Sequence, residues 1–124
     1  ITIASASNAI DFGDATVARG SGLGGCSNGT RGVAGGGYVS GASNVIDFVI
    51  IASTGDATDF GDLTAARSGV GACSDGTKGV WGGGKNNGTR VNTMDYVNMA
   101  SSGDASDFGD LTGGINNLAA CSGD

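Results

Sequence analysis

The chain has 124 residues, with six Lys and Arg against twelve acidic residues, a net charge of −6, and 26 glycines. All twelve acids are Asp, and Pro, His, Glu and Gln are absent from the sequence. This composition favours turns over helix interiors, and the negative charge argues against nucleic acid or an anionic membrane as a partner. No apolar run approaches the ~18 residues of a membrane helix, so we expect no membrane insertion.

One sequence unit returns about every 48 residues. The spacing is 48 or 47 residues within three sets of equivalent positions: Phe12, Phe60 and Phe108; Asp11, Asp59 and Asp107; Cys26, Cys73 and Cys121. A fixed period of this size indicates a repeat architecture, in which each copy packs against its neighbours. We therefore expect a single repeat domain of about 2.6 units, approximately residues 1–46, 47–94 and 95–124, in a longer chain or an oligomer.

The first copy has three apolar segments separated by turn residues. The segments span residues 19–27, 31–37 and 44–52, and residues 1–3 resemble the end of a segment of the last kind. Asn28 and Gly29 lie between the first two segments. Because Asn-Gly tolerates positive φ, this dipeptide predicts a hairpin turn there.

The second copy repeats this pattern and adds a fourth segment. Its segments span residues 67–74, 78–84, 92–100 and 107–112, with a hairpin turn predicted at 74–77 and a polar loop at 85–90. Each copy also contains a glycine triplet, at 35–37 and 82–84, which allows positive φ and a close approach of neighbouring backbones.

These segments predict an all-β fold of tandem four-stranded repeats. Four strands of ~5–6 residues and their turns consume about 45 residues, which is typical of one β-propeller blade. A β-solenoid is the alternative, with two coils in each unit. A propeller ring needs ~4–8 blades, so we expect this chain to complete a ring only with further repeats.

The predicted core is narrow, because aromatic residues are few and much of the hydrophobic fraction is Ala. Its predicted members are the three repeated phenylalanines together with Val33, Val45, Ile46, Phe48, Val80, Trp81, Met94 and Tyr96. The three cysteines lie in stretches of small apolar residues, so we expect them to be small buried hydrophobes rather than metal ligands.

The acidic residues of the repeat are the candidate ligands and ion-pair partners. The repeated set comprises Asp56, Asp59 and Asp62; Asp104, Asp107 and Asp110; Asn8, Asp11 and Asp14. Three interpretations are open: turn capping by the side chains, ion pairs with Arg19 or Arg67, each five residues past an Asp of the set, and a Ca²⁺ site.

Asp47 and Asp95 lie inside apolar segments, where a carboxylate must face solvent or find a partner. Two explanations are open: a structural one, in which the acids protect an edge strand from aggregation, and a catalytic one, in which they form a pair of catalytic carboxylates. Both acids recur in the repeat, however, whereas catalysis normally needs one asymmetric site. With no His to act as a base, we assign no catalytic residue, no metal ligand and no cofactor.

Two resemblances follow from these segments. VWGGG at 80–84, TMDYV at 93–97 and the Ala66-Arg67 dipeptide resemble the Kelch repeat, which implies a β-propeller fold, although Trp81 precedes the glycines instead of following them. The runs NVIDFV and NTMDYV, followed by IASTGDATDFGDLT and its copy, resemble glycine-rich tandem repeats in structural and fibre proteins of tailed phages from aquatic environments. That resemblance spans essentially the whole chain.

The resemblance implies a non-enzymatic structural protein, either a virion or tail-fibre component or another fibre component, that acts in assembly or attachment. Its expected partners are copies of itself or other virion proteins, and its expected location is the virion or the extracellular space. The alternative is a glycan- or protein-binding β-propeller module, adhesin-like or lectin-like. It would use the loops at 38–43 and 85–91 to recognise a cell-surface glycan or a protein.

Overall fold

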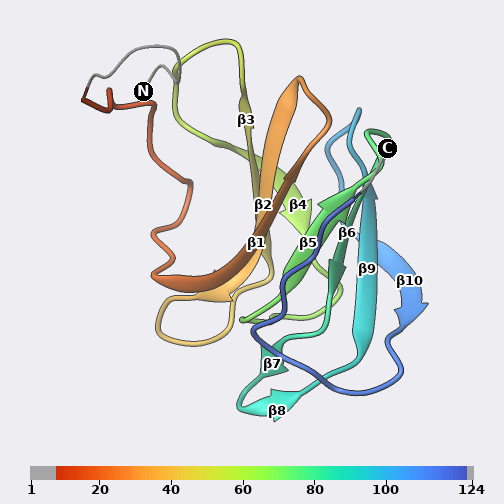
Figure 1. Cartoon of the computed structure of the whole chain (residues 1–124). Helices are drawn as coiled ribbons and strands as arrows, with labels where there is room; N and C mark the ends of the chain where they lie inside the picture. Colours follow the sequence, from red (N-terminus) through yellow and green to blue (C-terminus); the bar gives the residue numbers. More distant parts are fainter. Residues whose placement is uncertain (1–7, 123–124) are drawn as a thin grey trace.

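The computed structural model describes residues 8–122, which form an all-β structure of two four-stranded sheets and one small hairpin (Figure 1). The first sheet contains β1 (Ser21–Ser27), β2 (Arg31–Tyr38), β3 (Val45–Ile50) and β4 (Thr58–Asp62). The second contains β5 (Gly71–Ser74), β6 (Lys78–Gly82), β9 (Thr93–Asn98) and β10 (Ser106–Asp110). The hairpin consists of β7 (Lys85–Asn86) and β8 (Thr89–Arg90).

Each copy of the sequence repeat folds as one antiparallel meander. The strand orders are β1-β2-β3-β4 and β5-β6-β9-β10, and every neighbouring pair in both sheets is antiparallel. The predicted four-stranded units and both hairpin turns are therefore confirmed. The solenoid alternative is wrong for these sheets, because the coils of a parallel β-helix pair in parallel. The polar loop predicted at 85–90 contains the additional hairpin.

The sheets do not begin and end where the sequence units were divided. The first runs from residue 21 to 62 and the second from 71 to 110, so divisions at 46/47 and 94/95 fall inside β3 and β9. The segment at residues 1–3 lies outside the described residues. Within the described part, residues 10–14 lie before the first sheet and residues 115–121 after the second.

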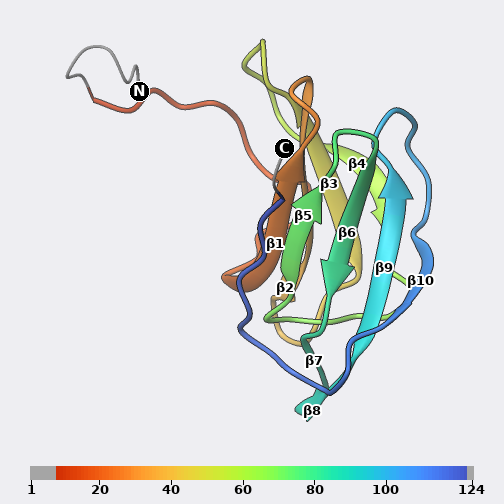
Figure 2. The same ribbon diagram turned by 45° about the vertical axis from the view of Figure 1, so that its right-hand side comes forward.

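The two sheets pack face to face, and the core lies between them (Figure 2). Its buried members come from one face of each sheet and from the segment that joins β4 to β5: Val33, Ile46, Phe60, Leu63, Val70, Trp81, Val97 and Met99. We call this packed interface the joint. Alternation along the strands places the joint residues of the first sheet on the face opposite Ala34 and Val49. In the second sheet the joint residues lie opposite Val80 and Tyr96.

The predicted core was only partly correct. Val33, Ile46, Phe60 and Trp81 are buried, whereas Val45, Phe48, Val80, Met94 and Tyr96 are half-buried, and Phe12 and Phe108 are exposed. Equivalent residues differ because only one face of each sheet is covered by the other sheet. The prediction also missed Leu63, Val70, Val97 and Met99, which complete the joint.

The glycine triplets allow the segment between the sheets to lie directly on β2 and β6. Gly36 has φ 73° and Gly37 has φ 107°, as predicted for positive-φ positions. A Cβ atom on Gly36 would lie 2.7 Å from the carbonyl oxygen of Arg67, and that oxygen accepts a hydrogen bond from the Gly37 N–H at 2.9 Å. The predicted close approach of two backbones is therefore confirmed.

Gly36→Ala is expected to destabilise the protein more than Gly29→Ala. Both glycines have positive φ, which costs a non-glycine residue about 1–2 kcal/mol, but a Cβ on Gly29 has no atom within 4 Å. The clash at Gly36 adds about 1–3 kcal/mol, as in other overpacked sites. Urea unfolding of the two variants measures the difference. Equal losses would show that the contact with Arg67 relaxes without cost.

The hairpin turn before β6 carries an aspartate whose ionised form is stabilised locally. Asp75 Oδ1 accepts hydrogen bonds from the Lys78 N–H at 2.7 Å and the Thr77 N–H at 2.8 Å. These backbone bonds, that of Lys78 first, lower the pKa of Asp75. In the first repeat Asn28 makes the equivalent bonds to Thr30 and Arg31 with its amide oxygen.

Asp75→Asn is expected to make the stability less sensitive to acid. The folded pKa of Asp75 lies below its unfolded value of about 3.9. Its contribution is therefore complete above the unfolded pKa and is lost as the pH falls through the folded one. Asn keeps the acceptor without titrating. When the pH is lowered from 7 to 3, the urea midpoint should fall further for the unmodified chain than for the variant. Equal falls would contradict the assignment.

Candidate functional site

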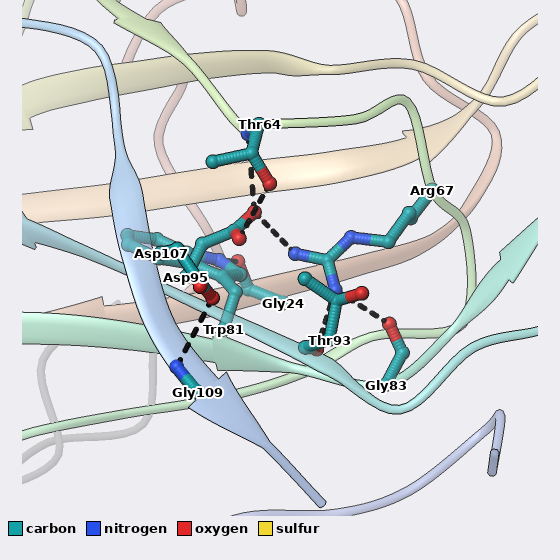
Figure 3. A network of polar contacts seen from close by, with 9 residues as sticks. All are labelled: Gly24, Thr64, Arg67, Trp81, Gly83, Thr93, Asp95, Asp107 and Gly109. Atoms are coloured by element: carbon teal, nitrogen blue, oxygen red, sulfur yellow. Dashed lines mark hydrogen bonds and ion pairs between the residues drawn. The ribbon is translucent and has the colours of Figure 1, made fainter.

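A buried ion pair between Arg67 and Asp95 forms the polar centre of the joint (Figure 3). Asp95 lies on β9, and its carboxylate also accepts hydrogen bonds from the Thr64 N–H at 3.1 Å and the Thr64 hydroxyl at 2.6 Å. The guanidinium donates to the carbonyl oxygens of Gly83 at 3.1 Å and Thr93 at 2.6 Å. Both side chains of the pair are almost completely excluded from solvent. Arg67 thereby ties the segment between the sheets to β6 and β9.

The same arrangement occurs in the first repeat. Arg19 pairs with Asp47 on β3, the Thr16 hydroxyl donates to the same carboxylate, and Arg19 Nη1 donates to the Val45 carbonyl oxygen at 2.7 Å. A group that recurs with the same partners in both repeats is a structural element, because each copy holds its own sheet to the segment that precedes it. Neither copy forms an isolated pair of carboxylates.

Two sequence predictions about these residues were wrong. The arginines pair with Asp47 and Asp95, not with Asp14 and Asp62, because the folded sheet brings together residues 28 positions apart. Asp47 and Asp95 also do not protect edge strands, since β3 and β9 are interior strands of their sheets. The expectation that these acids need a partner was correct.

The repeated aspartates of the outer strands act on the backbone. Asp56 Oδ1 accepts from the Asp14 N–H at 3.0 Å, and Asp104 Oδ1 accepts from the Asp62 N–H at 3.1 Å. In addition, Asp11 accepts from the Gly13 N–H and Asp107 from the Gly109 N–H, two residues further along the chain. These carboxylates bond their own backbone, as the turn-capping interpretation expected, but Asp107 does so at the bulge of β10 and not in a turn. Residues 8–122 contain no group of three or more Asp, Cys, His or Glu side chains placed to hold a metal ion.

The three cysteines lie along one depression of about 280 Å³ between β1, β5 and residues 120–122. Cys26 and Cys73 are half-buried and Cys121 is exposed, so the expectation of three buried cysteines was wrong for Cys121. Burial, and to a smaller extent the neighbouring Cys73, raises the pKa of Cys26 to about 11. Cys26 therefore remains a thiol at neutral pH and is a poor nucleophile.

A groove of about 390 Å³ lies where the loops at 38–43 and 85–91 meet. It is lined by Tyr38, Ser40, Gly41, Ala42, Ser68, Lys85, Asn87 and Gly88. The sequence identified both loops as candidate binding loops, and the structure brings them together. Ser68 could not be found from the sequence. It enters because its backbone pairs with that of Lys85, with N–H to oxygen distances of 3.0 and 2.8 Å.

A second, largely apolar hollow of about 570 Å³ covers the face of the first sheet that points away from the joint. Residues from β1, β2 and β3 line it, among them Leu23, Gly32, Ala34 and Val49. On the second sheet the position equivalent to Ala34 holds Trp81, which fills the joint and is completely buried. The hollow therefore lies on the surface that corresponds to the joint face of the second sheet.

No protein-family model matches the chain, and a search of curated proteins found no match to it. Its class therefore rests on the fold: an all-β repeat protein built from two four-stranded antiparallel meanders. The described residues include no helix with the length and hydrophobicity that crossing a membrane requires.

Proposed function

We propose that this chain is a non-enzymatic structural repeat protein, a component of a phage virion, a tail fibre or another fibre. Its two sheets would be successive blades of a Kelch-like β-propeller, and its role would be assembly or attachment outside the cell. The virion assignment depends on the sequence resemblance to glycine-rich phage repeats. The stacking role is supported by the relation between the two uncovered faces of the sheets.

The observation that carries the proposal is that each uncovered face is equivalent, in the sequence repeat, to one of the two faces that pack together in the joint. On the second sheet, Phe108 is 50% exposed, whereas its equivalent in the joint, Phe60, is 2% exposed. On the first sheet, Ile51 is 45% exposed, whereas its equivalent in the joint, Met99, is completely buried. One end of the stack thus presents the surface that the other end is shaped to receive, and head-to-tail addition can continue.

The terminal segments support the same stacking direction. Residues 12–14 accept hydrogen bonds from the Gly55 N–H at 2.7 Å and the Ala57 N–H at 2.8 Å. Residues of the outer strand β4 make the equivalent bonds. The Phe60 carbonyl oxygen accepts from the Gly103 N–H at 2.7 Å, and the Asp62 carbonyl oxygen accepts from the Ala105 N–H at 2.8 Å. Residues 12–14 therefore hold the place of an outer strand of a preceding sheet.

Self-association of the purified chain tests the stacking role. Sedimentation at increasing concentration should show association that Phe108→Asp abolishes, because a charge on this face opposes burial. Val39→Asp is the matched control, since Val39 is 50% exposed, as Phe108 is, and lies in the loop between β2 and β3 instead of on a sheet face. Electron microscopy should show rings or filaments, and antibodies to the chain should label virions. A chain that stays monomeric, or equal effects of the two variants, would contradict stacking.

The second candidate function is a glycan- or protein-binding β-propeller module. The observation that favours it is the groove at the meeting point of the two loops. Loops on a rigid scaffold are the usual place for recognition residues. A glycan array without hits, together with a pull-down without a specific protein partner, would count against this candidate and leave the structural role unaffected.

A further inference from the structure

The loop groove is the place where the two repeats stop resembling each other. The strands before it read RGVAGGG and KGVWGGG, and the strands after it share Asn, Asp and Val at equivalent positions. Between them, the first repeat has the six residues YVSGAS and the second has the seven residues KNNGTRV. The groove thus combines two unlike loops on a repeated framework, so it is an asymmetric feature of an otherwise repetitive structure.

Backbone hydrogen bonds hold the groove in shape. The first loop is closed by the N–H groups of Val39 and Ser43, which donate to Gly41 at 3.0 Å and Gly37 at 2.8 Å. The second loop is a two-residue hairpin in which Asn87 has φ 46° and Gly88 has φ 87°, as a type I′ turn requires. A ligand would therefore meet a largely preformed surface, which lowers the entropic cost of binding.

The charge of the groove is opposite to that of the chain. The sequence has twelve acidic residues, yet no acid occurs at 15–46, 63–74 or 76–94, the stretches that contain every residue of the groove. Lys85 is the one charged residue in the lining. The two ion pairs of the described part of the chain join Arg19 to Asp47 and Arg67 to Asp95, so neither neutralises Lys85.

The remaining lining residues offer one aromatic ring and several neutral polar groups. Tyr38 is 48% exposed at the end of β2, and an exposed phenol ring presents a flat apolar surface with a polar tip. Ser40, Ser68 and Asn87 carry hydroxyl or amide groups that can both donate and accept hydrogen bonds. This combination suits a ligand that has an apolar ring face, many hydroxyl groups and one anionic group.

We infer that this groove binds an acidic saccharide, a sugar chain bearing a carboxylate or a sulfate. The Lys85 ammonium pairs with the anionic group, the Tyr38 ring packs against the C–H face of a sugar ring, and the neutral polar groups bind sugar hydroxyls. An acidic peptide fits less well, because the lining has a single cation for a ligand of many charges. The inference adds a ligand class to the proposed attachment role and binding module. It rests on the proposed function only in assigning the saccharide to a cell surface.

Titration of the ¹⁵N-labelled chain with an aldotetraouronic acid, a tetrasaccharide that carries a single carboxylate, tests the inference. Amide shifts should appear at Tyr38, Ser68, Lys85 and Asn87. The carboxyl-reduced, neutral tetrasaccharide should bind about tenfold more weakly, which is the value of one charge-assisted hydrogen bond. Lys85→Gln should weaken binding of the acidic sugar to the same extent, and Lys85→Arg should retain it.

Lys78→Gln is the matched control, because Lys78 lies over the Tyr96 ring, away from the groove. Equal losses in Lys78→Gln and Lys85→Gln would overturn the inference in favour of nonspecific attraction. So would equal binding of tetra-aspartate, or the absence of shifts with millimolar sugar. Tyr38→Ala gives a second test if a lysine variant unfolds. Neutral glycans binding as tightly would refute the acidic preference yet preserve the binding module, and none of these results bears on stacking.

Discussion

Replacing Arg67 with Met is expected to lower the free energy of unfolding by about 3–5 kcal/mol, the usual cost of leaving one partner of a buried ion pair alone. Asp95 would keep its bonds from Thr64 but lose its cation in a site without solvent access. The Gly83 and Thr93 carbonyl oxygens would also lose the Nη1 donor. Urea unfolding followed by Trp81 fluorescence measures the loss, since Trp81 lies in the same joint.

Two further variants separate the unpaired charge from lost packing. The double variant Arg67→Met with Asp95→Leu should recover much of the stability, because apolar replacement of both partners is often neutral. Arg19→Met should cost somewhat less than Arg67→Met, because both ion pairs are almost completely buried but Arg19 donates to one backbone carbonyl oxygen and Arg67 to two. If the double variant were as unstable as the single one, the guanidinium would be acting chiefly through its carbonyl bonds.

The sequence was sufficient to predict the repeating unit, because a 48-residue period, turn dipeptides and short apolar segments are all local features. Gly29, Gly36 and Gly37 take the positive φ that their residue type allows, whereas Asn28 in the same hairpin turn does not. The sequence could not predict which side of each sheet is covered. Phe60 and Phe108 share the surrounding sequence DFGDLT, and the presence of a packed neighbouring sheet makes one buried and the other exposed.

The ion-pair partners of the two arginines also could not be predicted from the local sequence. The Arg–Asp pairs join residues 28 positions apart, and this separation becomes a contact only when the meander sets the register between strands. The groove gives a similar lesson. Its two loops could be identified from the sequence, but the backbone pairing of Ser68 with Lys85 at the groove joins distant parts of the chain and could not.

Trp81→Ala is expected to cost about 3–5 kcal/mol, as for other buried aromatic residues. The indole is completely buried between the sheets, and its N–H donates to the Gly24 carbonyl oxygen at 2.9 Å. A Cβ on Gly35 would lie 3.0 Å from the indole nitrogen, so the ring packs directly on the first sheet. Truncation therefore removes packing, one hydrogen bond and most of the contact that holds the two sheets together. Guanidinium unfolding followed by far-UV circular dichroism measures the loss.

The reverse substitution at the equivalent position provides the control for this prediction. Ala34→Trp places the same side chain over the open hollow of the first sheet, where the described residues provide no second sheet to bury it. Its effect on the unfolding of the isolated chain should stay within ~0.5 kcal/mol, as for most surface changes. In an assembly, that indole would face Gly82 of an added sheet, the residue equivalent to Gly35. Ala34→Trp should then strengthen association. A stabilised monomer with unchanged association would mean that the indole folds into its own hollow, and that tight joints require the tryptophan of the second repeat.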